Sequence, residues 1–464
     1  MAQQTFFFYD LETSGKDPRT HRIMQFAGQR TDMNLNPLGD PMNIVVRLDR
    51  EIIPEPQAIL ITGITPQYTV EHGIPERDAI RRIMEEAFTS DTIATGFNNV
   101  RFDDEFMRFT AYRNFHDPYE WSWYEGRSRW DMLDVVRLVR ALKPEGIGWP
   151  VDQDGKPINK LGPLAAANNL SLERAHDAMS DVFSLIDIAR LIRDRRPKMF
   201  DFLLNHRLKN DVAEIVNPNS PKPFVYASGI YGADCCFTTV AYPVGFGQNK
   251  SVIAYDLRQD PSLYTSMTVD ELRDLRFMKR EDRIGRGLPP FPAKHLHGNK
   301  CPAVAPYGAL TGDIAQRLGL DKAAIARHAA QISISNIGSK LIEIFSEERQ
   351  FEKGDVDGEL YSGFFSNDDK LKMPRVRNAS PEVLKNFIPS FKDKRLTELF
   401  QRYKAHNAPE YLTEKERSDW NDYCTKRRKL EVEKYSLEMA ILTELEGEDN
   451  EIIRSLKEWS SEAY

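Results

Sequence analysis

Two acidic residues that follow an apolar segment are the first candidates for chemistry. Asp10 and Glu12 close the run TFFFYDLE, whose aromatic residues are typical of a buried β-strand. Because side chains two residues apart on a strand point to the same face, both carboxylates would face one way and could hold one hard cation. A solvated strand end also carries acids often, so the pair by itself leaves both interpretations open.

A second acidic position follows the strand-like segment TIATGF. In GFNNVRFDDEF, the residues Asn99, Phe102 and Asp103 form an NxxFD pattern at the start of a predicted helix. Asp103 is a candidate for a catalytic carboxylate. Asp103 or Asp104 could instead cap the helix, because Asp side chains accept hydrogen bonds from the free N–H groups of a first turn.

The segment AHDAMSD supplies a histidine and an acid at the start of a long amphipathic pattern. Asp177 is the better candidate to cap this helix, which leaves His176 and Asp181 for chemistry. With an ordinary pKa of about 6.5, a histidine can accept a proton near neutral pH. A single histidine near a helix start is usually structural or exposed, but its position after the two earlier motifs favours a catalytic role.

The patterns around these residues predict an α/β layout for the first part of the chain. TFFFYDLE, IMQFAGQRT, NIVVRL and TIATGF have the composition of strands. ERDAIRRIMEEAF, DDEFMRFTAYR, WDMLDVVRLVRAL and HDAMSDVFSLIDIARLIRDRR repeat apolar residues at helical spacing. Pro197 marks the end of the last of these helices and a domain boundary.

The remainder of the chain shows two further sequence patterns, one typical of strands and one typical of helices. The proline-rich connector VNPNSPKPF precedes short strand-like runs such as FVYASGIYG, CCFTTVAYPV and SVIAYDL, which predict a compact, mostly β domain. From KDKRLTELF onward the sequence is highly charged and almost entirely helical in pattern. We therefore expect an α/β domain, a β domain and a helical domain, in that order.

The composition fits a protein of several packed domains. The chain has 464 residues, of which 41% are hydrophobic and 29% charged, and its net charge is -7. This acidic total excludes a protein that binds nucleic acid through its overall charge, so a polyanion site would be a local basic surface. The four cysteines show no metal-binding spacing, and the sequence has neither a signal-peptide pattern nor an apolar run of membrane length. We expect reduced thiols and a cytoplasmic location.

Taken in order, the DxE pair, the NxxFD pattern and the AHDAMSD segment resemble the three motifs of the DEDDh exonuclease superfamily, and ILITGIT is also similar to it. Longer segments narrow the resemblance to the bacterial exonuclease I family: NNVRFDDE, RNFHDPYEWSW, RWDMLDVVR, LKPEGIGWP and, with a thinner match, KCPAV and LYSGFFSNDD. Leu11 departs from the aromatic residue expected between the two acids in many members. All five catalytic positions fit the motifs.

The resemblance implies an RNase H-like DEDDh exonuclease domain at residues 1–198, an SH3-like domain at residues 199–350 and a C-terminal helical domain at residues 351–464. The two accessory domains would close around a DNA strand. It also implies processive degradation of single-stranded DNA from the 3′ end, release of 5′-mononucleotides, and a role in DNA repair and recombination. We expect a monomer.

The implied reaction explains why these residue types are needed. Hydrolysis of a phosphodiester requires an activated water, a neutralised phosphate and a stabilised leaving oxygen, and two metal ions about 3.5 to 4 Å apart can supply all three. Oxygen ligands suit Mg²⁺, with Mn²⁺ as a substitute. We expect Asp10, Glu12 and Asp181 to hold the first ion, Asp10 to bridge to the second with help from Asp103, and His176 to be the general base.

Single-strand binding combines basic residues for the phosphates with aromatic rings for the bases. Arginines and aromatic residues are interleaved around the NxxFD pattern, and Thr13 is expected from the resemblance to lie near the terminal sugar. The residues expected to contact the substrate are Glu12, Thr13, Asn99, Phe102, Arg113 and Trp123. Two further basic stretches, ARLIRDRRPKMF and LRDLRFMKREDRIGR, are candidates for the DNA groove.

The resemblance also implies a protein partner. Family members bind the acidic, hydrophobic C-terminal tail of single-stranded DNA-binding protein, and such capture needs a basic residue beside an apolar pocket. Lys143 in LKPEGIGW is the candidate for this contact, although an exposed lysine without a partner is the commoner case.

Two other functions stay open from the sequence. Another DEDDh nuclease, such as an RNA-trimming enzyme or a proofreading subunit, would need only the first domain, so the long accessory region argues against it. A non-catalytic DNA-binding scaffold would have lost at least one of the five catalytic residues, and all five are present.

Overall fold

The computed structural model describes residues 4–170, 178–347 and 354–461. The contacts within the chain group it into two compact units. The first unit comprises Met1–Arg129, Leu172–Ile186 and Glu352–Tyr464, and the second comprises Trp130–Ser171 and Asp187–Phe351.

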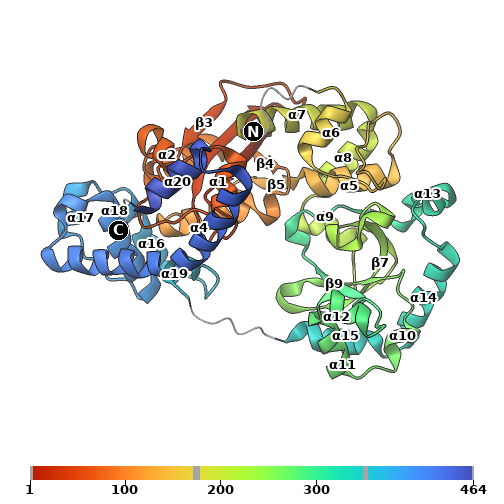
Figure 1. Ribbon diagram of the computed structural model, residues 1–464. Coiled ribbons are helices and arrows are strands. Elements are labelled where there is room, and N and C mark those ends of the chain that lie inside the picture. The colour runs from red at the N-terminus through yellow and green to blue at the C-terminus, as the bar shows by residue number, and fades with distance from the viewer. Residues whose placement is uncertain (1–3, 171–177, 348–353, 462–464) are drawn as a thin grey trace. The chain divides into compact units, whose positions relative to one another are not determined.

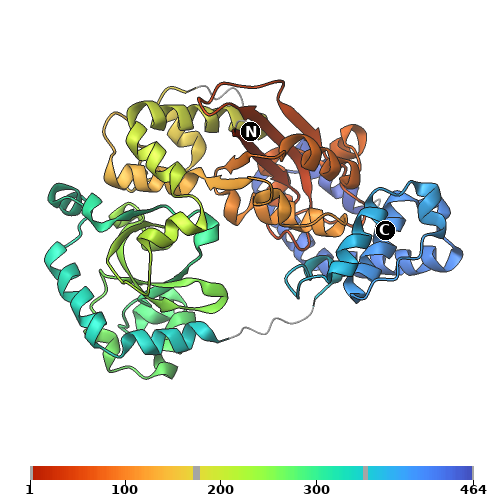
Figure 2. The same cartoon turned by 180° about the vertical axis from the view of Figure 1, so that it is seen from behind.

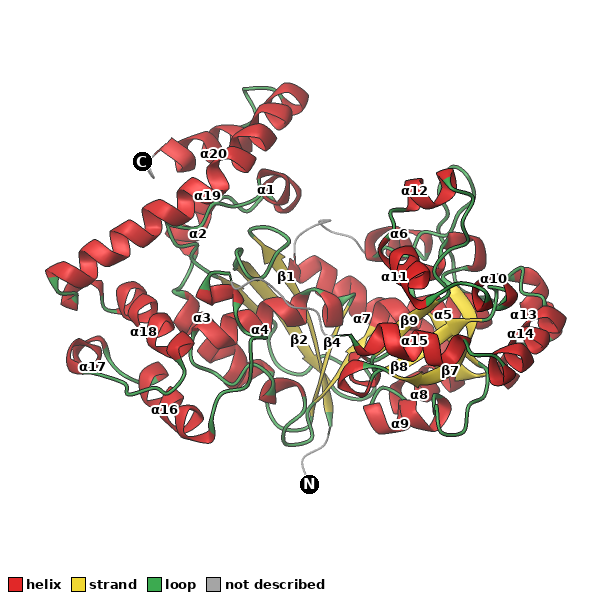
Figure 3. Ribbon diagram, turned by 90° about the horizontal axis from the view of Figure 1, so that it is seen from below, coloured by secondary structure: helices red, strands yellow, loops and turns green. Residues whose placement is uncertain are grey.

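The first unit is built around a mixed sheet with the strand order β3-β2-β1-β4-β5. β1 pairs antiparallel with β2 and parallel with β4, so it lies in the interior of the sheet. The chain passes from the first unit to the second within β5. The strands, yellow in Figure 3, span Thr5–Thr13 (β1), Ile23–Thr31 (β2), Met42–Val45 (β3), Thr92–Gly96 (β4) and Ser128–Asp131 (β5).

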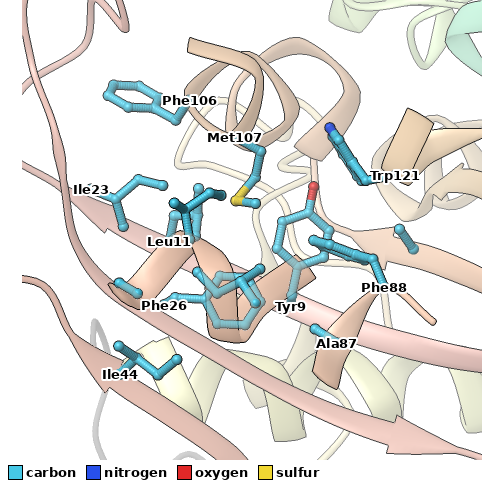
Figure 4. Close-up of a cluster of buried hydrophobic side chains, with 14 of the residues drawn as sticks. Tyr9, Leu11, Ile23, Phe26, Ile44, Ala87, Phe88, Phe106, Met107 and Trp121 are labelled. Carbon is cyan, nitrogen blue, oxygen red and sulfur yellow. The ribbon is translucent and has the colours of Figure 1, made fainter. Parts of the chain in front are cut away.

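One face of this sheet is covered by an aromatic core. Tyr9 and Leu11 of β1 pack with Phe26 of β2, with Phe88, and with Met107 of the helix α4, which spans Asp103–Arg113 (Figure 4). The rings of Tyr9 and Phe26 are stacked, with their centroids 5.8 Å apart. This core fixes β1 and the start of α4 relative to each other.

The C-terminal helices complete the first unit. Tyr112 of α4 packs with Leu399 of α18, and Ile59 of α1 packs with Met439 of α19 and Leu456 of α20. Figure 1 shows α19 and α20, in blue, beside α1 and α2. The helices of this unit span Pro56–Thr62 (α1), Pro66–His72 (α2), Glu76–Arg82 (α3), Asn367–Arg377 (α16), Pro381–Asn386 (α17), Lys394–Asn407 (α18), Glu414–Glu446 (α19) and Glu451–Ser461 (α20).

The second unit contains an antiparallel sheet with the order β10-β6-β7-β8-β9, drawn in yellow-green and green in Figure 2. Its core joins Phe224 and Tyr226 of β6, Ala254 of β8 and Leu296 of β9. The strands span Phe224–Ala227 (β6), Thr238–Phe246 (β7), Val252–Asp256 (β8), Ala293–Leu296 (β9) and Val304–Pro306 (β10).

The second unit also contains helices. They span Met132–Leu142 (α5), Leu161–Ala167 (α6), Pro197–Asn205 (α8), Lys209–Ile215 (α9), Ser262–Thr265 (α10), Val269–Phe277 (α11), Arg280–Gly285 (α12), Gly312–Arg317 (α13), Lys322–Ile334 (α14) and Ile337–Ser346 (α15). Of these helices, α5, α9, α14 and α15 contact the sheet. α7, at Ala178–Arg195, begins in the first unit and ends in the second.

The predicted fold class is confirmed, because an α/β part, a small antiparallel sheet and a helical C-terminal part follow one another along the chain. Two features differ from the patterns in the sequence. The middle part holds more helix than expected, since LRDLRFMKREDRIGR forms α11 and α12. The C-terminal helices group with the first sheet because apolar side chains from both segments share the same cores. Within the described ranges, every helix is too short or too polar to cross a membrane.

Candidate active site

β1 and α7 bring three carboxylates together. Asp10 and Glu12 lie on β1, and Asp181 lies in the first turn of α7. An oxygen atom from each of the three lies within 4.8 Å of the oxygens from the other two. The three residues predicted to hold a metal ion are therefore neighbours in the structure.

The alternation of β1 explains why these acids gather on one side. Tyr9 and Leu11 are buried in the aromatic core (Figure 4). Asp10 and Glu12, at the intervening positions, are only half-buried. Pairing with β2 and β4 holds the strand rigidly, so the two carboxylates have a fixed spacing.

The acids of this site repel one another. Burial raises the pKa of Asp10 well above its usual value, and the nearby carboxylates of Asp103, Glu12 and Asp181 raise it further. Repulsion of this kind disfavours the fully ionised state, and a bound cation would relieve it. Several hard carboxylate oxygens in one place suit a divalent metal ion, so the residues present fit such an ion.

Asp103 and Asp104 are adjacent in sequence but have different surroundings. The buried Asp104 carboxylate accepts hydrogen bonds from the Tyr9 hydroxyl at 2.5 Å and from Nη1 of Arg129 at 2.5 Å. Asp103, also buried, is close enough to Asp10 to raise its pKa. Asp104 is thus tied to the scaffold, and Asp103 is the acid that faces the carboxylate cluster.

The proposed general base falls outside the described residues. His176 lies in the segment 171–177, so its distance from the cluster is not part of the described structure. The described part of α7 begins at Ala178, two residues further along the chain.

Three of the residues expected to contact the substrate are Thr13, Asn99 and Phe102, and each has a defined contact within the first unit. The Thr13 hydroxyl donates a hydrogen bond to the carbonyl oxygen of Gly15 at 2.8 Å. Asn99 is fully buried, and its amide donates to Asp104 at 3.3 Å. Phe102 is half-buried against the aromatic core. These contacts restrict the orientation of the three side chains, and their contact with substrate stays a prediction.

Arg113 requires a correction. Its side chain is buried, with Nη2 3.1 Å from Oε2 of Glu76, and Nη1 donates to the carbonyl oxygen of Pro18 at 3.2 Å. Since these contacts occupy the guanidinium in the interior, Arg113 has a structural role and we do not retain it as a substrate contact. An arginine close to a motif gives no indication in the sequence of whether it will be buried.

Exposed aromatic side chains are found in two segments of the first unit. Trp123, which was predicted to contact substrate, is 63% exposed. Tyr361 and Phe364, in the LYSGFFSNDD segment, are 57% and 87% exposed and were not singled out from the sequence. The Tyr361 hydroxyl donates to Oε2 of Glu105 at 2.5 Å, which places this residue near the start of α4. Their aromatic type was visible in the sequence, but their exposure was not.

In the second unit, Lys143 lines a cavity of about 500 Å³. The apolar part of its lining includes Met199, Phe202 and Pro306. Three further cations contribute to the lining: Arg195, Arg196 and Lys198. Lys143 therefore lies beside an apolar pocket with a basic border, and its contact with a partner stays a prediction.

Models of three known families match successive parts of the chain. The model described as Exonuclease matches residues 7–189, the Exonuclease I SH3-like domain matches residues 207–347, and the Exonuclease I C-terminal domain matches residues 354–463. The first match contains Asp10, Glu12, Asp103 and Asp181.

Full-length relatives agree with these models. Exodeoxyribonuclease I of Haemophilus influenzae is 38% identical over 458 residues, which cover 98% of this chain and 97% of the relative. The crystal structure of Escherichia coli exonuclease I in complex with a dA16 oligonucleotide is 36% identical, has a TM-score of 0.95 and covers 100% of both chains. A crystal structure of SSB/exonuclease I with the inhibitor CFAM is 35% identical, with a TM-score of 0.90 and 100% of both chains covered. The chain therefore belongs to the exodeoxyribonuclease I family of exonucleases.

Proposed function

We propose that this chain, a 3′-to-5′ exonuclease of single-stranded DNA, works processively, releases 5′-mononucleotides and uses two Mg²⁺ ions. The observation that carries the proposal is the cluster of Asp10, Glu12 and Asp181 in a chain that matches its relatives over almost its whole length. The relative solved with dA16 supports single-stranded DNA as the substrate. A monomeric, cytoplasmic enzyme of DNA repair and recombination is part of the same proposal.

The cluster assigns a role to each acid. Asp10, Glu12 and Asp181 would hold the first ion, while Asp10 and Asp103 would contribute to a second. When bound, Mg²⁺ neutralises charge on the phosphate and lowers the pKa of the attacking water, and Mn²⁺ could replace it. His176 would accept the proton from that water.

A nuclease assay with matched acid variants tests the cluster. Purified protein with Mg²⁺ is incubated with labelled single-stranded DNA, duplex DNA or RNA. We expect rapid loss of the single-stranded DNA only, and no loss with Asp181→Ala. Asp194→Ala is the control, because Asp194 lies on the same helix with its side chain 66% exposed. Activity in Asp181→Ala, or equal degradation of duplex and single strands, would contradict the proposal.

A second variant tests the base. His176→Ala should lose roughly 100- to 10,000-fold in turnover, as is typical for general bases, while it still binds Mn²⁺. Wild-type turnover with intact metal binding would remove His176 from the mechanism.

The strand would be held by exposed rings and by a basic cavity. Trp123 and Phe364 offer unstacked aromatic surfaces, and each stacked base contributes about 1 to 3 kcal/mol. In the second unit, a cavity of about 380 Å³ is lined by five cations and one carboxylate, that of Asp256. The five cations are Arg258, Arg276, Arg280, Arg283 and Lys294. We assign this cavity to the phosphate backbone of the strand.

Neighbouring charges on α12 provide a matched test of the cavity. Arg280 and Arg283 line it, whereas Lys279 and Arg286 flank the same helix and do not. Arg280→Ala/Arg283→Ala should weaken binding of oligo(dT), measured by fluorescence anisotropy, more than Lys279→Ala/Arg286→Ala. Equal losses would mean that only the overall charge matters.

The cavity beside Lys143 suits an acidic peptide with an apolar C-terminal residue. The apolar residue would fill the space next to Met199 and Phe202, and the carboxylates would face Lys143 and Lys198. The SSB/exonuclease I structure supports the tail of single-stranded DNA-binding protein as this partner.

A labelled peptide with the sequence of such a tail tests the site. Lys143→Ala and Phe202→Ala should each weaken peptide binding, whereas Lys160→Ala should not, because Lys160 is exposed and lies outside the cavity lining. Unchanged binding in both cavity variants would place the partner elsewhere.

A further inference from the structure

A histidine of the C-terminal helices lies between two carboxylates of the sheet-bearing part of the first unit. Nδ1 of His406, in the last turn of α18, is 2.8 Å from Oδ2 of Asp49, and Nε2 is 3.2 Å from Oε1 of Glu51. Asp49 and Glu51 lie in the loop that follows β3. We call these three side chains the histidine link.

The link is partly shielded from water, since the His406 and Asp49 side chains are each 24% exposed. The Glu51 side chain is only 5% exposed, and the ring of Trp420 on α19 meets the His406 ring edge-on at 4.9 Å. The last turn of a helix also favours a positive charge, because the backbone carbonyls there point toward it. An imidazole can donate to two carboxylates at once only when both nitrogens carry a proton, which is its charged form.

The electrostatic surroundings agree with this geometry. Burial alone would lower the pKa of His406, but Asp49 and Glu51 outweigh it and raise the pKa well above the usual value. Burial likewise opposes ionisation of Glu51, yet the facing His406 holds the pKa of Glu51 down to about 2.

Other groups around the link keep their charge state near and above neutral pH. The charged and titratable groups that line the cavity beside the link, or that act on its residues, are Arg22, Arg47, Glu76, Arg77, Arg113, Asp357, Arg402, Tyr403, Tyr423, Cys424 and Arg427. Burial raises the pKa of Tyr403 to about 12. Burial opposes ionisation of Glu76, but Arg113 and Arg22 hold its pKa below the usual value. Arginine and aspartate stay ionised between about pH 6 and about pH 9. Burial raises the pKa of Tyr423 above its ordinary value and that of Cys424 to about 12, so both stay neutral.

Two other histidines of this unit also stay neutral in that range. Burial lowers the pKa of His21 to about 4 and that of His116 to about 3. Among the groups named here, His406 is the one whose charge changes as the pH rises above neutral.

We propose that the histidine link is a proton-operated tie, which holds α18 against the loop after β3 while His406 is charged and releases it at alkaline pH. The same three side chains could be suspected of binding a metal ion. An imidazole binds a metal through one nitrogen, however, and here each nitrogen faces its own carboxylate. A proton shared on both sides of the ring fits this arrangement.

The sign of the pH dependence follows from linkage. In the unfolded chain His406 has a pKa of about 6.5, and in the folded chain the value is higher. The stabilisation by the tie is therefore complete below about pH 6.5 and is lost as the pH rises through the folded value.

Thermal unfolding of the full chain between about pH 6 and about pH 10 tests the tie. His406→Gln cannot become charged and should lower the midpoint of the first transition by a few degrees at pH 6, with the difference from wild type shrinking as the pH rises. His406→Arg keeps a charge at every pH and should become more stable than wild type at alkaline pH. His72→Gln, an exposed histidine on α2, is the control and should follow wild type throughout.

Nuclear magnetic resonance of protein with labelled histidine provides the second readout. The signal that disappears in His406→Gln should titrate well above pH 6.5. The tie is refuted if that signal titrates at or below 6.5, or if His406→Gln and wild type have equal midpoints at pH 6. If a metal ion occupied the link instead, EDTA would lower the midpoint of wild type more than that of His406→Gln, because both proteins keep the Asp10 cluster and only wild type keeps the link. That result would also overturn the proposal.

Discussion

At the scale of single residues, the neighbouring acids Asp103 and Asp104 have different roles. Asp104 is buried with Arg129, Tyr9 and Asn99 around its carboxylate, whereas Asp103 adds to the repulsion at Asp10. Asp104 is therefore tied to the scaffold, whereas Asp103 adds negative charge beside Asp10.

Asp104→Asn should destabilise the protein strongly. The substitution removes the charge of the carboxylate that pairs with the buried Arg129 at 2.5 Å, and breaking a buried ion pair in this way costs about 3 to 5 kcal/mol. Urea unfolding followed by circular dichroism measures the free energy of unfolding. Tyr9→Phe, which removes one hydrogen bond, should cost only about 1 kcal/mol. A loss for Asp104→Asn as small as that of Tyr9→Phe would contradict this role.

Asp103→Asn should reduce turnover without destabilising the protein. Removing its charge relieves repulsion at Asp10, so the stability of the metal-free protein should be unchanged or higher. Turnover should fall roughly 10- to 100-fold, as expected for an acid that supports a metal site from its periphery. Unfolding and nuclease assays on the same preparation separate the two effects, and a simple loss of stability would assign Asp103 to the scaffold.

The raised pKa of Asp10 predicts a link between pH and metal. Without metal the folded chain holds this proton more tightly than the unfolded chain, so stability falls as the pH rises from about 4 through the folded value. Mg²⁺ should therefore raise the thermal midpoint more at pH 8 than at pH 5, and Asp10→Asn should lose most of this gain. An equal gain at both pH values would argue against a metal ion at this cluster.

At the scale of elements, a buried ion network joins the C-terminal region to the first sheet. Asp357, just before α16, lies 2.5 Å from Nη2 of Arg22 and 2.8 Å from Nη1 of Arg402. Arg427 on α19 approaches the same carboxylate at 3.3 Å. Three arginines thus share the Asp357 carboxylate, and Arg402 also pairs with Asp355 and Glu398. This network adds to the apolar cores that join these distant segments in one unit.

Asp357→Asn should therefore be more damaging than the loss of any one of these arginines. It leaves three buried guanidinium groups facing each other without the shared charge, so we expect a loss of about 3 to 5 kcal/mol. Arg427→Gln should cost less, because Arg22 and Arg402 still pair with Asp357. Urea unfolding of both variants measures the difference in the free energy of unfolding. A larger loss for Arg427→Gln than for Asp357→Asn would contradict this expectation.

At the scale of the whole molecule, the local charge of a surface can be opposite in sign to the net charge of the chain. The chain carries a net charge of -7, yet the cavity on the second unit is lined by five cations and one carboxylate. A negative protein that binds a negative strand must do so through such local basic surfaces.

Binding of single-stranded DNA should therefore depend steeply on salt. The logarithm of the affinity should fall linearly with the logarithm of the salt concentration, with a slope of about -0.7 for each phosphate contacted. Arg280→Ala/Arg283→Ala should make the slope shallower, and Lys279→Ala/Arg286→Ala should not. Anisotropy titrations at several NaCl concentrations supply these slopes; a salt-independent affinity would exclude binding through basic surfaces.

The sequence by itself determined the chemistry and the order of the parts. Period-two alternation places Asp10 and Glu12 on one face of a strand, helical spacing predicts the segments around Asp103 and Asp181, and both depend only on residues close in sequence. The candidate metal-binding acids and their motifs could be identified from the sequence because they too depend only on residues close in sequence.

Only the tertiary structure decided what each charged or aromatic side chain meets. Arg113 is buried against Glu76, Asp104 is taken by Tyr9 and Arg129, and Phe364 is left exposed, although none of these outcomes follows from residue type. Burial and pairing depend on segments that are remote along the chain. The carboxylate cluster depends on both: the local pattern supplied its acids, and the tertiary fold brought Asp181 of α7 to Asp10 and Glu12 of β1.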